Sequence, residues 1–256
     1  MINIDCYAYS NNLKTVHPLE KSLFAMLTMV VCLTSSTVVI PLIVLAFMAG
    51  GIIFRAGIPI RFFLHLMLVP LSFLFISILT IAFSISTNPS GFWFAQTING
   101  LTIGTRYPDL IIAIHLFLKS LGAVSCLYFL ALTTPMTEII TLLHRMKVPV
   151  IITELMVLIY RFIFVFMETA ITIRRAQSSR LGYISMKSSY RSLSRLFSAL
   201  LGKVFVKSQE LYNAMAARGY TGEIKVLTKK YPVSLRNYIL ITGFELPLIL
   251  LNLLGR

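Results

Sequence analysis

The chain has 256 residues, of which 57% are apolar and only 12% are charged. Soluble domains carry about 25% charged residues, so this composition excludes an ordinary soluble protein and indicates one embedded in a membrane. The formal net charge is +14 and is unevenly placed, because residues 171–236 hold 13 Lys or Arg against 2 Asp or Glu. Such density beside membrane helices predicts the cytoplasmic side and contact with membrane lipid. We expect no nucleic acid as a partner, because no nucleic-acid-binding fold surrounds these charges.

Residues 1–132 are predicted to form a membrane domain with four spans. Residues 1–21 are polar and contain no signal peptide, so the first span is expected to direct insertion. The apolar stretch that follows has no charge and, as one helix, would be about 50 Å long against about 30 Å of hydrocarbon. It therefore predicts two helices, 22–40 and 41–55, that divide at Pro41.

The other two spans of this domain are separated by a loop. Span 62–86 contains Pro70, which is expected to kink it and which frees a backbone carbonyl that neighbours can satisfy. A loop at 87–107 follows, and the fourth span covers 109–132. Together with a last transmembrane helix at 237–256, this predicts an all-α polytopic membrane protein with about five transmembrane helices.

Residues 133–236 are predicted to form a cytoplasmic coupling domain of long helices. A short helix at 135–147 opens with a proline, which is favoured in a first helical turn. A helix at 150–172 follows, and then an amphipathic helix that begins near Ser189 and ends at Gly219.

The helix at 150–172 is apolar enough to cross a membrane, but charges recur along it at every seventh residue. They are Glu154, Arg161, Glu168 and Arg175. A period of seven places them in one stripe, and each charge inside the apolar stretch would cost at least about 2.5 kcal/mol at a bilayer centre. A crossing here would also place the basic region 171–236 outside the cell. We therefore predict that this helix lies along or beneath the membrane.

The residue types that support catalysis or metal binding are scattered. The cysteines and histidines are Cys6, Cys32, Cys126, His17, His65, His115 and His144. They have no metal-ligand spacing, no nucleophile is paired with a base, and no glycine loop ends in Gly-Lys-Ser/Thr. We therefore expect no catalytic residue, no metal site, no cofactor and no nucleotide site in this chain.

Two charged residues, Lys119 and Glu245, lie well inside the fourth and last spans. Each is about ten residues from the expected outer end of its helix, and each alone is costly in hydrocarbon. The matched depth leads to the hypothesis of a buried ion pair. The alternative is that either side chain snorkels or lines a wet crevice.

A short motif occurs twice in the basic region. The first copy is Ala176-Gln177-Ser178-Ser179-Arg180, and the second is Ala214-Met215-Ala216-Ala217-Arg218-Gly219. Small residues let a helix approach another protein closely, and arginine offers a charged five-donor fork to carboxylates or helix C-terminal carbonyls. The repeat predicts two helix ends that dock into equivalent grooves of a dimeric partner. The alternative is that both arginines only join the belt of positive charge at the membrane surface.

In these motifs the chain resembles the T component of energy-coupling factor (ECF) transporters. The matching stretches are Ala214–Tyr220, Ala176–Arg180 and Thr133–Pro149 with Leu143, Arg145 and Val148. The continuation Tyr160-Arg161 and the run His17-Pro18-Leu19-Glu20-Lys21 are most similar to the cobalt-type Q subunit (CbiQ-like). The resemblance covers nearly the whole chain, although Ser179-Arg180-Leu181 stands where the family has Ala-Arg-Gly.

The resemblance implies a non-catalytic subunit of an ATP-driven cobalt or nickel uptake transporter, multi-pass in the inner membrane of a bacterial or archaeal cell. Two ATP-binding ATPase subunits would dock on the cytoplasmic arginine motifs through Arg180, Arg218, Ala176, Ala214, Ala217 and Gly219. A separate substrate-binding membrane subunit would contact Leu196, Leu200, Ile163 and Phe164. Movement of the ATPases would tilt the long helices and gate that subunit, which would itself bind the metal ion.

Three other functions remain open at this point. A coupling subunit for a vitamin-type ECF transporter remains an alternative, because the substrate would bind another protein. A self-contained secondary carrier would need intramembrane polar sites and a repeat of spans. A membrane-anchored regulator would explain the motifs but not the apolar helix at 150–172.

Overall fold

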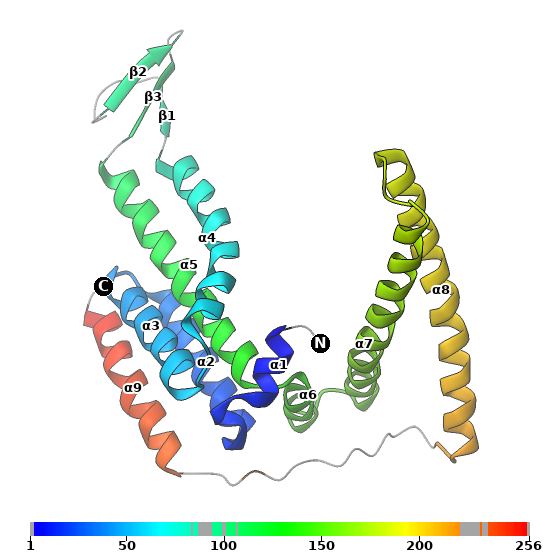
Figure 1. The fold of residues 1–256 in the computed structure, drawn as a ribbon. Helices are drawn as coiled ribbons and strands as arrows, with labels where there is room; N and C mark the ends of the chain where they lie inside the picture. The colour runs from blue at the N-terminus through cyan, green and yellow to red at the C-terminus, as the bar shows by residue number, and fades with distance from the viewer. Residues whose placement is uncertain are drawn as a thin grey trace. The chain divides into compact units, whose positions relative to one another are not determined.

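The structure is a computed structural model, and it describes residues 3–82, 84–86, 94–98, 101–105, 107–220, 231 and 235–254. The chain divides into two compact units (Figure 1). The bundle unit comprises Ile2–Pro135 and Lys230–Arg256, and the arm unit comprises Met136–Lys229. The chain therefore crosses between the units twice, after Pro135 and after Lys229.

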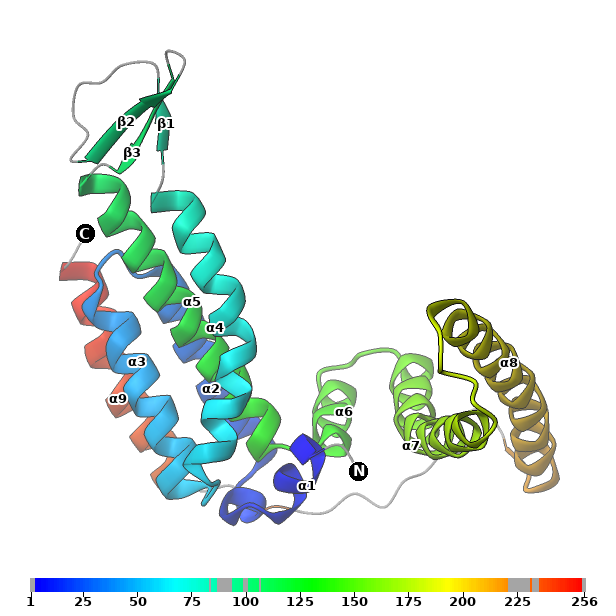
Figure 2. The same ribbon diagram turned by 45° about the horizontal axis from the view of Figure 1, so that its top comes forward.

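The bundle unit is built from helices that surround α5. Its helices are α1 (Asn3–Ser10), α2 (Pro18–Thr34), α3 (Val39–Gly50), α4 (Ile60–Ala82), α5 (Tyr107–Thr133) and α9 (Leu235–Leu254). A 3-10 helix, Asn12–Thr15, precedes α2, and a π-helical segment, Gly51–Arg55, extends α3. Helix α5 contacts α1, α2, α3 and α4, while α9 packs on α2 (Figure 2). The predicted all-α polytopic class is confirmed by this bundle.

The break between α2 and α3 lies at residues 35–38 and not at Pro41, where the sequence placed it. Ser35 Oγ donates to the backbone carbonyl of Thr37 at 2.8 Å, a local contact that competes with continuation of the helix. Pro41 lies in the first turn of α3, where a backbone N–H would have no intrahelical partner. The proline therefore starts a helix here and does not divide one.

The proline inside α4 leaves the helix continuous. Pro70 cannot donate to the carbonyl of Leu66, four residues before it. The hydroxyl of Tyr128 on α5 donates to that carbonyl at 3.1 Å. A neighbouring helix thus satisfies the freed group, as a span in hydrocarbon requires.

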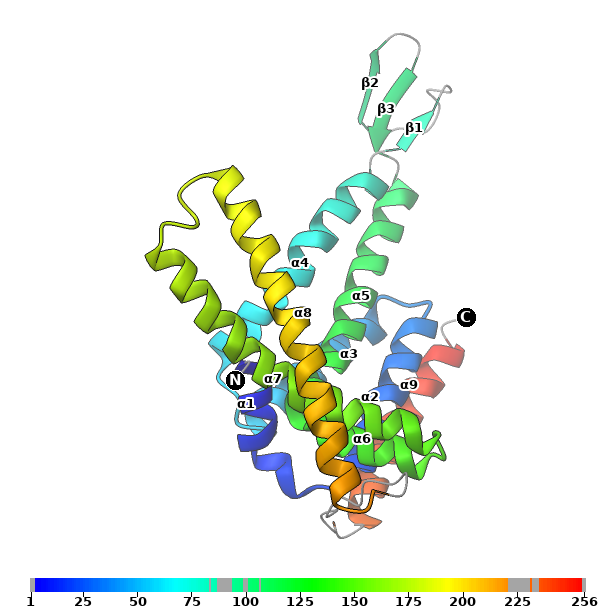
Figure 3. The same cartoon turned by 90° about the vertical axis from the view of Figure 1, so that its right-hand side faces the viewer.

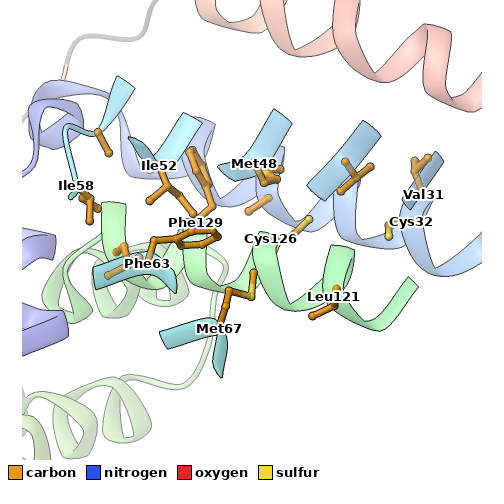
Figure 4. Close-up of a cluster of buried hydrophobic side chains, with 14 of the residues drawn as sticks. Val31, Cys32, Met48, Ile52, Ile58, Phe63, Met67, Leu121, Cys126 and Phe129 are labelled. Carbon is orange, nitrogen blue, oxygen red and sulfur yellow. The ribbon is translucent and has the colours of Figure 1, made fainter. Parts of the chain in front are cut away.

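The core of the bundle unit lies where α2, α3, α4 and α5 meet (Figure 4). Its members include Cys32, Met48, Ile52, Met67, Cys126 and Phe129. Gly122 on α5 allows the closest approach, because a Cβ at this position would lie 2.7 Å from Cys32 Sγ and 3.2 Å from the carbonyl oxygen of Pro41. The absence of a side chain here lets α5 touch both α2 and α3.

A small antiparallel sheet occupies the end of the predicted span 62–86 and part of the predicted loop 87–107. Its strands are β1 (Ser84–Ser86), β2 (Phe94–Ile98) and β3 (Leu101–Thr105), in the order β1-β3-β2. The register pairs Ile85 with Ile103 and Gln96 with Ile103. The sheet joins α4 to α5, so it lies at one end of these two helices (Figure 1).

Among the described residues, four helices are long and apolar enough to span a membrane. They are Ile60–Ile81, Pro108–Thr133, Val150–Ser179 and Leu235–Leu254, and Val39–Arg55 is a shorter apolar helix. Helix α2 has 17 residues, somewhat fewer than the roughly 20 of a full crossing. The chain is therefore a multi-pass membrane protein. The helix that begins at Val150 is among these four by its length and composition alone. That it lies along the membrane, and does not cross it, stays a prediction.

The arm unit consists of α6 (Met136–Arg145), α7 (Val150–Ser179) and α8 (Met186–Ala217). Helix α6 packs on α7, and α7 packs on α8 (Figure 3). Helix α7 extends to Ser179, beyond the expected residue 172, because nothing in the Arg174–Ser179 stretch stops a helix. Helix α8 begins after Ser185, whose hydroxyl accepts from the N–H of Ser188 at 3.2 Å.

Candidate partner-docking site

The two arginine motifs lie at the C-terminal ends of the two long arm helices. Arg180 is the last partly helical residue of α7, with φ −97° and ψ 20°. Arg218 has the same position on α8, with φ −92° and ψ 9°. The sequence repeat therefore corresponds to a structural repeat of two helix ends.

The same hydrogen-bond pattern closes both helix ends. In α7, the N–H of Gly182 donates to the carbonyl of Gln177 at 2.9 Å. In α8, the N–H of Tyr220 donates to the carbonyl of Met215 at 3.1 Å. These bonds, five residues apart in sequence, define Schellman caps. Each arginine is therefore held at a fixed place relative to its helix axis.

The residue after each arginine adopts the left-handed conformation that such a cap needs. Gly219 has φ 72° and Leu181 has φ 59°. The first motif departs from the family by carrying leucine here, yet its backbone follows the same course as that of the second. A non-glycine residue in this region costs roughly 1–2 kcal/mol. The departure changes the strain at the first helix end and not its shape.

Both helix ends face solvent. The expected docking residues Ala176, Ala214, Ala217 and Gly219 are exposed, as are Arg180 and Arg218. Among the described residues, neither arginine has a carboxylate within 4.0 Å. Each guanidinium is thus available to a carboxylate or to helix C-terminal carbonyls of another protein.

The end of α7 is fixed to the start of α8 through Gln177, a member of the first motif. The side-chain amide of Gln177 donates to the carbonyl of Ser192 at 3.0 Å and accepts from the Tyr183 hydroxyl at 2.8 Å. The hydroxyls of Ser188 and Ser192 both donate to the carbonyl of Gly182. The corner that carries Arg180 is therefore rigidly hydrogen-bonded.

The other end of α8 is tied to the start of α7. The hydroxyl of Tyr220 donates to Glu154 Oε2 at 2.8 Å. This hydrogen bond raises the pKa of Tyr220 above its usual range, because the carboxylate stabilises the neutral phenol. Glu154 is half-buried, whereas Arg161, Glu168 and Arg175 of the predicted charge stripe are exposed.

Between these two ties, α7 and α8 line a groove of about 570 Å³. Its walls are formed by Val165, Phe166, Thr169, Ala199, Gly202, Lys203, Val206, Lys207 and Glu210. A Cβ added at Gly202 would have nothing within 4 Å. A side chain at this position would therefore extend into open space.

The four residues expected at a substrate subunit are partly or fully exposed on α7 and α8, but none lines the groove. Ile163 is 44% exposed, and Phe164, Leu196 and Leu200 are half-buried. Phe164 stacks edge-on against Tyr160, with ring centroids 5.1 Å apart. The residues expected from the sequence therefore lie beside the groove on the same two helices.

The ion pair hypothesised between Lys119 and Glu245 is not formed in the structure. Glu245 Oε1 accepts from the Thr28 hydroxyl at 2.5 Å, and its Oε2 has no hydrogen-bond partner among the described residues. Equal depth in the membrane does not set the direction of a side chain around its helix, and Glu245 points toward α2. Among the described residues, no group of three or more His, Cys, Asp or Glu could hold a metal ion.

Comparisons with known proteins match this sequence to one family. The family model for the cobalt transport protein CbiQ matches residues 10–229. The cobalt transport protein CbiQ of Salmonella typhimurium is 33% identical over 157 residues, which cover 61% of this chain and 70% of that protein. An uncharacterized protein of Methanocaldococcus jannaschii is 32% identical over 253 residues, covering 99% of this chain and 93% of that protein.

A fused relative also matches. The putative fused cobalt transport protein CbiMQ of Methanocorpusculum labreanum is 29% identical over 219 residues, 86% of this chain but only 36% of that protein. The family model extends over the docking motifs, both arm helices and most of the bundle. The chain belongs to the CbiQ family of cobalt transport proteins.

Proposed function

We propose that this chain is the non-catalytic, energy-coupling membrane subunit of an ATP-driven cobalt uptake transporter. The observation that carries the proposal is the pair of solvent-exposed helix ends with the same cap geometry, each presenting one arginine. Two equivalent ends suit a partner with two equivalent grooves, such as a dimer of ATPase subunits. Arg180 and Arg218 would be the charged contacts, and Ala176, Ala214, Ala217 and Gly219 would allow close approach.

The substrate-binding partner would be a second membrane subunit on the arm helices. The name of the fused relative joins CbiM and CbiQ, and this chain matches about a third of its length. The exposed apolar side chains of α7 and α8 support such a contact, as does the groove around Gly202. Exposed apolar surface of this extent is typical of an interface with lipid or another protein.

The arm unit would lie on the cytoplasmic side. The net positive charge of residues 171–236 supports this orientation through the positive-inside rule. ATP binding by the docked subunits would move the two helix ends, and the rigid caps would transmit that motion along α7 and α8 to the substrate subunit. Cobalt is the cargo in this proposal and would bind the partner.

The proposal is tested by purifying the tagged chain from its native membrane in mild detergent and identifying the proteins that copurify. Wild type is compared with the double variant Arg180→Glu/Arg218→Glu. The matched control is Arg191→Glu/Arg195→Glu, which makes the same change of charge at two exposed arginines of α8 outside the motifs. We expect a nucleotide-binding ATPase with wild type and control and its loss from the motif variant. Retention by the motif variant would contradict the docking role.

A further inference from the structure

The run His17-Pro18-Leu19-Glu20-Lys21 opens α2, and the docking proposal does not use it. Its three polar members are among the most buried polar residues of the chain, with exposed fractions of 7% for His17, 1% for Glu20 and 3% for Lys21. Burial of charged side chains is costly unless hydrogen bonds compensate. The partners of these side chains therefore indicate what the run does.

Lys21 holds the end of α5. Its Nζ donates to the backbone carbonyl of Thr133 at 2.9 Å and to that of Leu13 at 3.3 Å. Thr133 is the last residue of α5 and stands two residues before Pro135, where the chain leaves the bundle unit. The Asn11 side-chain amide supports the same end by donating to the carbonyl of Leu132 at 3.2 Å. A buried cation thus caps helix carbonyls at the first crossing.

Glu20 holds the start of α9, and His17 contacts the chain just before it. Glu20 Oε2 accepts from the Asn237 side-chain amide at 2.7 Å, and Asn237 is in the first turn of α9. The His17 ring meets the Tyr231 ring edge-on, with centroids 6.2 Å apart. Tyr231 comes directly after Lys230, where the chain re-enters the bundle unit, and Asn237 follows in the first turn of α9. The second crossing is therefore anchored at the same helix start as the first.

We infer that His17, Glu20 and Lys21 form a crossover clamp: positioning residues that fix both chain connections between the bundle and arm units at the first turn of α2. The inference rests on the proposed function, because it assigns the clamp the task of holding the bundle still while the arm unit moves. Any displacement of the arm then has to be taken up in the connections beyond the clamp.

Each charged residue of the clamp has the donor or acceptor groups that its hydrogen-bond partner requires. The end of α5 presents backbone carbonyls, which only a donor can satisfy, and lysine is donor-only. The start of α9 presents an amide donor, which an ionised carboxylate accepts. Consecutive residues of a helix project about 100° apart, so Glu20 and Lys21 reach different neighbours from one turn of α2.

Hydrogen exchange of the full chain, followed by mass spectrometry, tests whether the clamp holds the crossings. Lys21→Met removes the donor to Thr133, and Lys14→Met removes an exposed lysine nearby as the matched control. We expect amides of residues 128–135 to exchange about tenfold faster in Lys21→Met, consistent with loss of a charge-assisted hydrogen bond, and at wild-type rates in the control.

The second crossing is tested by reversing the polarity of its hydrogen bond. Asn237→Asp places a carboxylate against Glu20, so exchange of residues 235–240 is expected to rise. The double variant Glu20→Gln/Asn237→Asp restores a donor opposite an acceptor, and exchange is expected to return toward the wild-type rate. Rescue shows that the variant chain folds and that the bond itself holds the helix start.

The positioning role is tested in the assembled transporter by the amount of ATP hydrolysed for each cobalt ion taken up. We expect this ratio to rise several-fold in Lys21→Met and Asn237→Asp, with normal copurification of the ATPase, and to recover in the double variant. Unchanged exchange at both crossings would overturn the clamp. Faster exchange with an unchanged ratio would overturn its positioning role. If wild type binds no ATPase, the proposed function fails, and exchange alone decides whether the three residues hold the crossings.

Discussion

The residue that follows the arginine differs between the two arginine motifs. Leu181 and Gly219 have almost the same φ, but only glycine reaches that conformation without strain. The side chain of Leu181 is 66% exposed, so contacts within the chain do little to offset the strain. The first helix end is therefore the weaker of two otherwise matching caps.

Substitutions at these two positions are expected to have opposite effects on stability. Gly219→Leu should lower the free energy of unfolding by roughly 1–2 kcal/mol, because it introduces the strain that Leu181 already bears. Leu181→Gly should raise it by less, since glycine loses more conformational entropy on folding. Thermal unfolding of the purified full chain measures both. Equal destabilisation by the two changes would contradict the strain at Leu181.

The hydrogen-bond partner of the buried Glu245 carboxyl could not be predicted from the sequence. Depth along two helices could be read from the sequence, but the rotation of each helix about its axis depends on the packing of all its neighbours. Thr28, with no exposed surface, is the residue that the packing brings to Glu245. Nothing about a threonine in an apolar stretch indicated that it would form a hydrogen bond with Glu245.

We expect Thr28→Val to destabilise the chain and Lys119→Met to leave it nearly unchanged. The valine removes the hydroxyl from Glu245 and leaves a buried polar group unsatisfied, which costs roughly 1–3 kcal/mol. Thermal unfolding in the same detergent compares the two variants. A larger loss for Lys119→Met than for Thr28→Val would restore the ion pair that the sequence suggested.

At the scale of elements, helix α4 shows what the sequence could and could not predict. Pro70 predicted both an interruption of the hydrogen-bond ladder and a neighbour that satisfies the freed carbonyl. The identity of that neighbour, Tyr128, depends on how α5 packs against α4 and is outside the reach of local patterns. The position of the break between α2 and α3 could not be predicted either. The chain leaves the helix after Thr34, at a polar stretch, and not at the more conspicuous Pro41.

A double-mutant cycle isolates the contact between Tyr128 and the proline site. Tyr128→Phe should destabilise wild type by roughly 1 kcal/mol, because the carbonyl of Leu66 loses its donor. In a Pro70→Ala background the backbone N–H of residue 70 can donate to that carbonyl, so the same change should have a much smaller effect. Equal effects in both backgrounds would mean that the hydroxyl serves another purpose.

The arginine motifs could be located at helix ends from their small residues and from Gly219, because glycine commonly follows a helix. The tight turn after the first motif, where Gln177 forms hydrogen bonds with Ser192 and Tyr183, could not be predicted from the sequence. Those partners are set by the angle between α7 and α8. The groove lined by Gly202 was missed for the same reason.

At the scale of the whole molecule, the position of α7 relative to the bilayer decides the topology. Its 30 residues are about 45 Å long, enough to cross. Its exposed charges at Arg161 and Glu168 make burial in hydrocarbon costly. The length and apolar composition of the helix thus favour a crossing of the bilayer, whereas its charge pattern opposes one. We favour a position along the membrane, which leaves the charges in water.

Cysteine labelling from each side of the membrane tests this topology. In a Cys6→Ser background, Ile151→Cys and Ser178→Cys place exposed thiols near the two ends of α7. We expect a membrane-impermeant maleimide to label both in inverted vesicles and neither in intact cells. Asp109→Cys, in the first turn of α5, and Thr137→Cys, in α6 just after the end of α5, should label from opposite sides and serve as the control. Opposite labelling of the two α7 positions would establish that α7 crosses.

The two ties between α7 and α8 also limit how the arm unit can deform. The Gln177 corner joins the helices at one end, and the bond from Tyr220 to Glu154 joins them at the other. Lengthwise sliding of one helix past the other would break both attachments, so shear is opposed. Outward bowing of the middle of either helix would preserve both. We therefore expect a pull on Arg180 or Arg218 to change the width of the groove between α7 and α8.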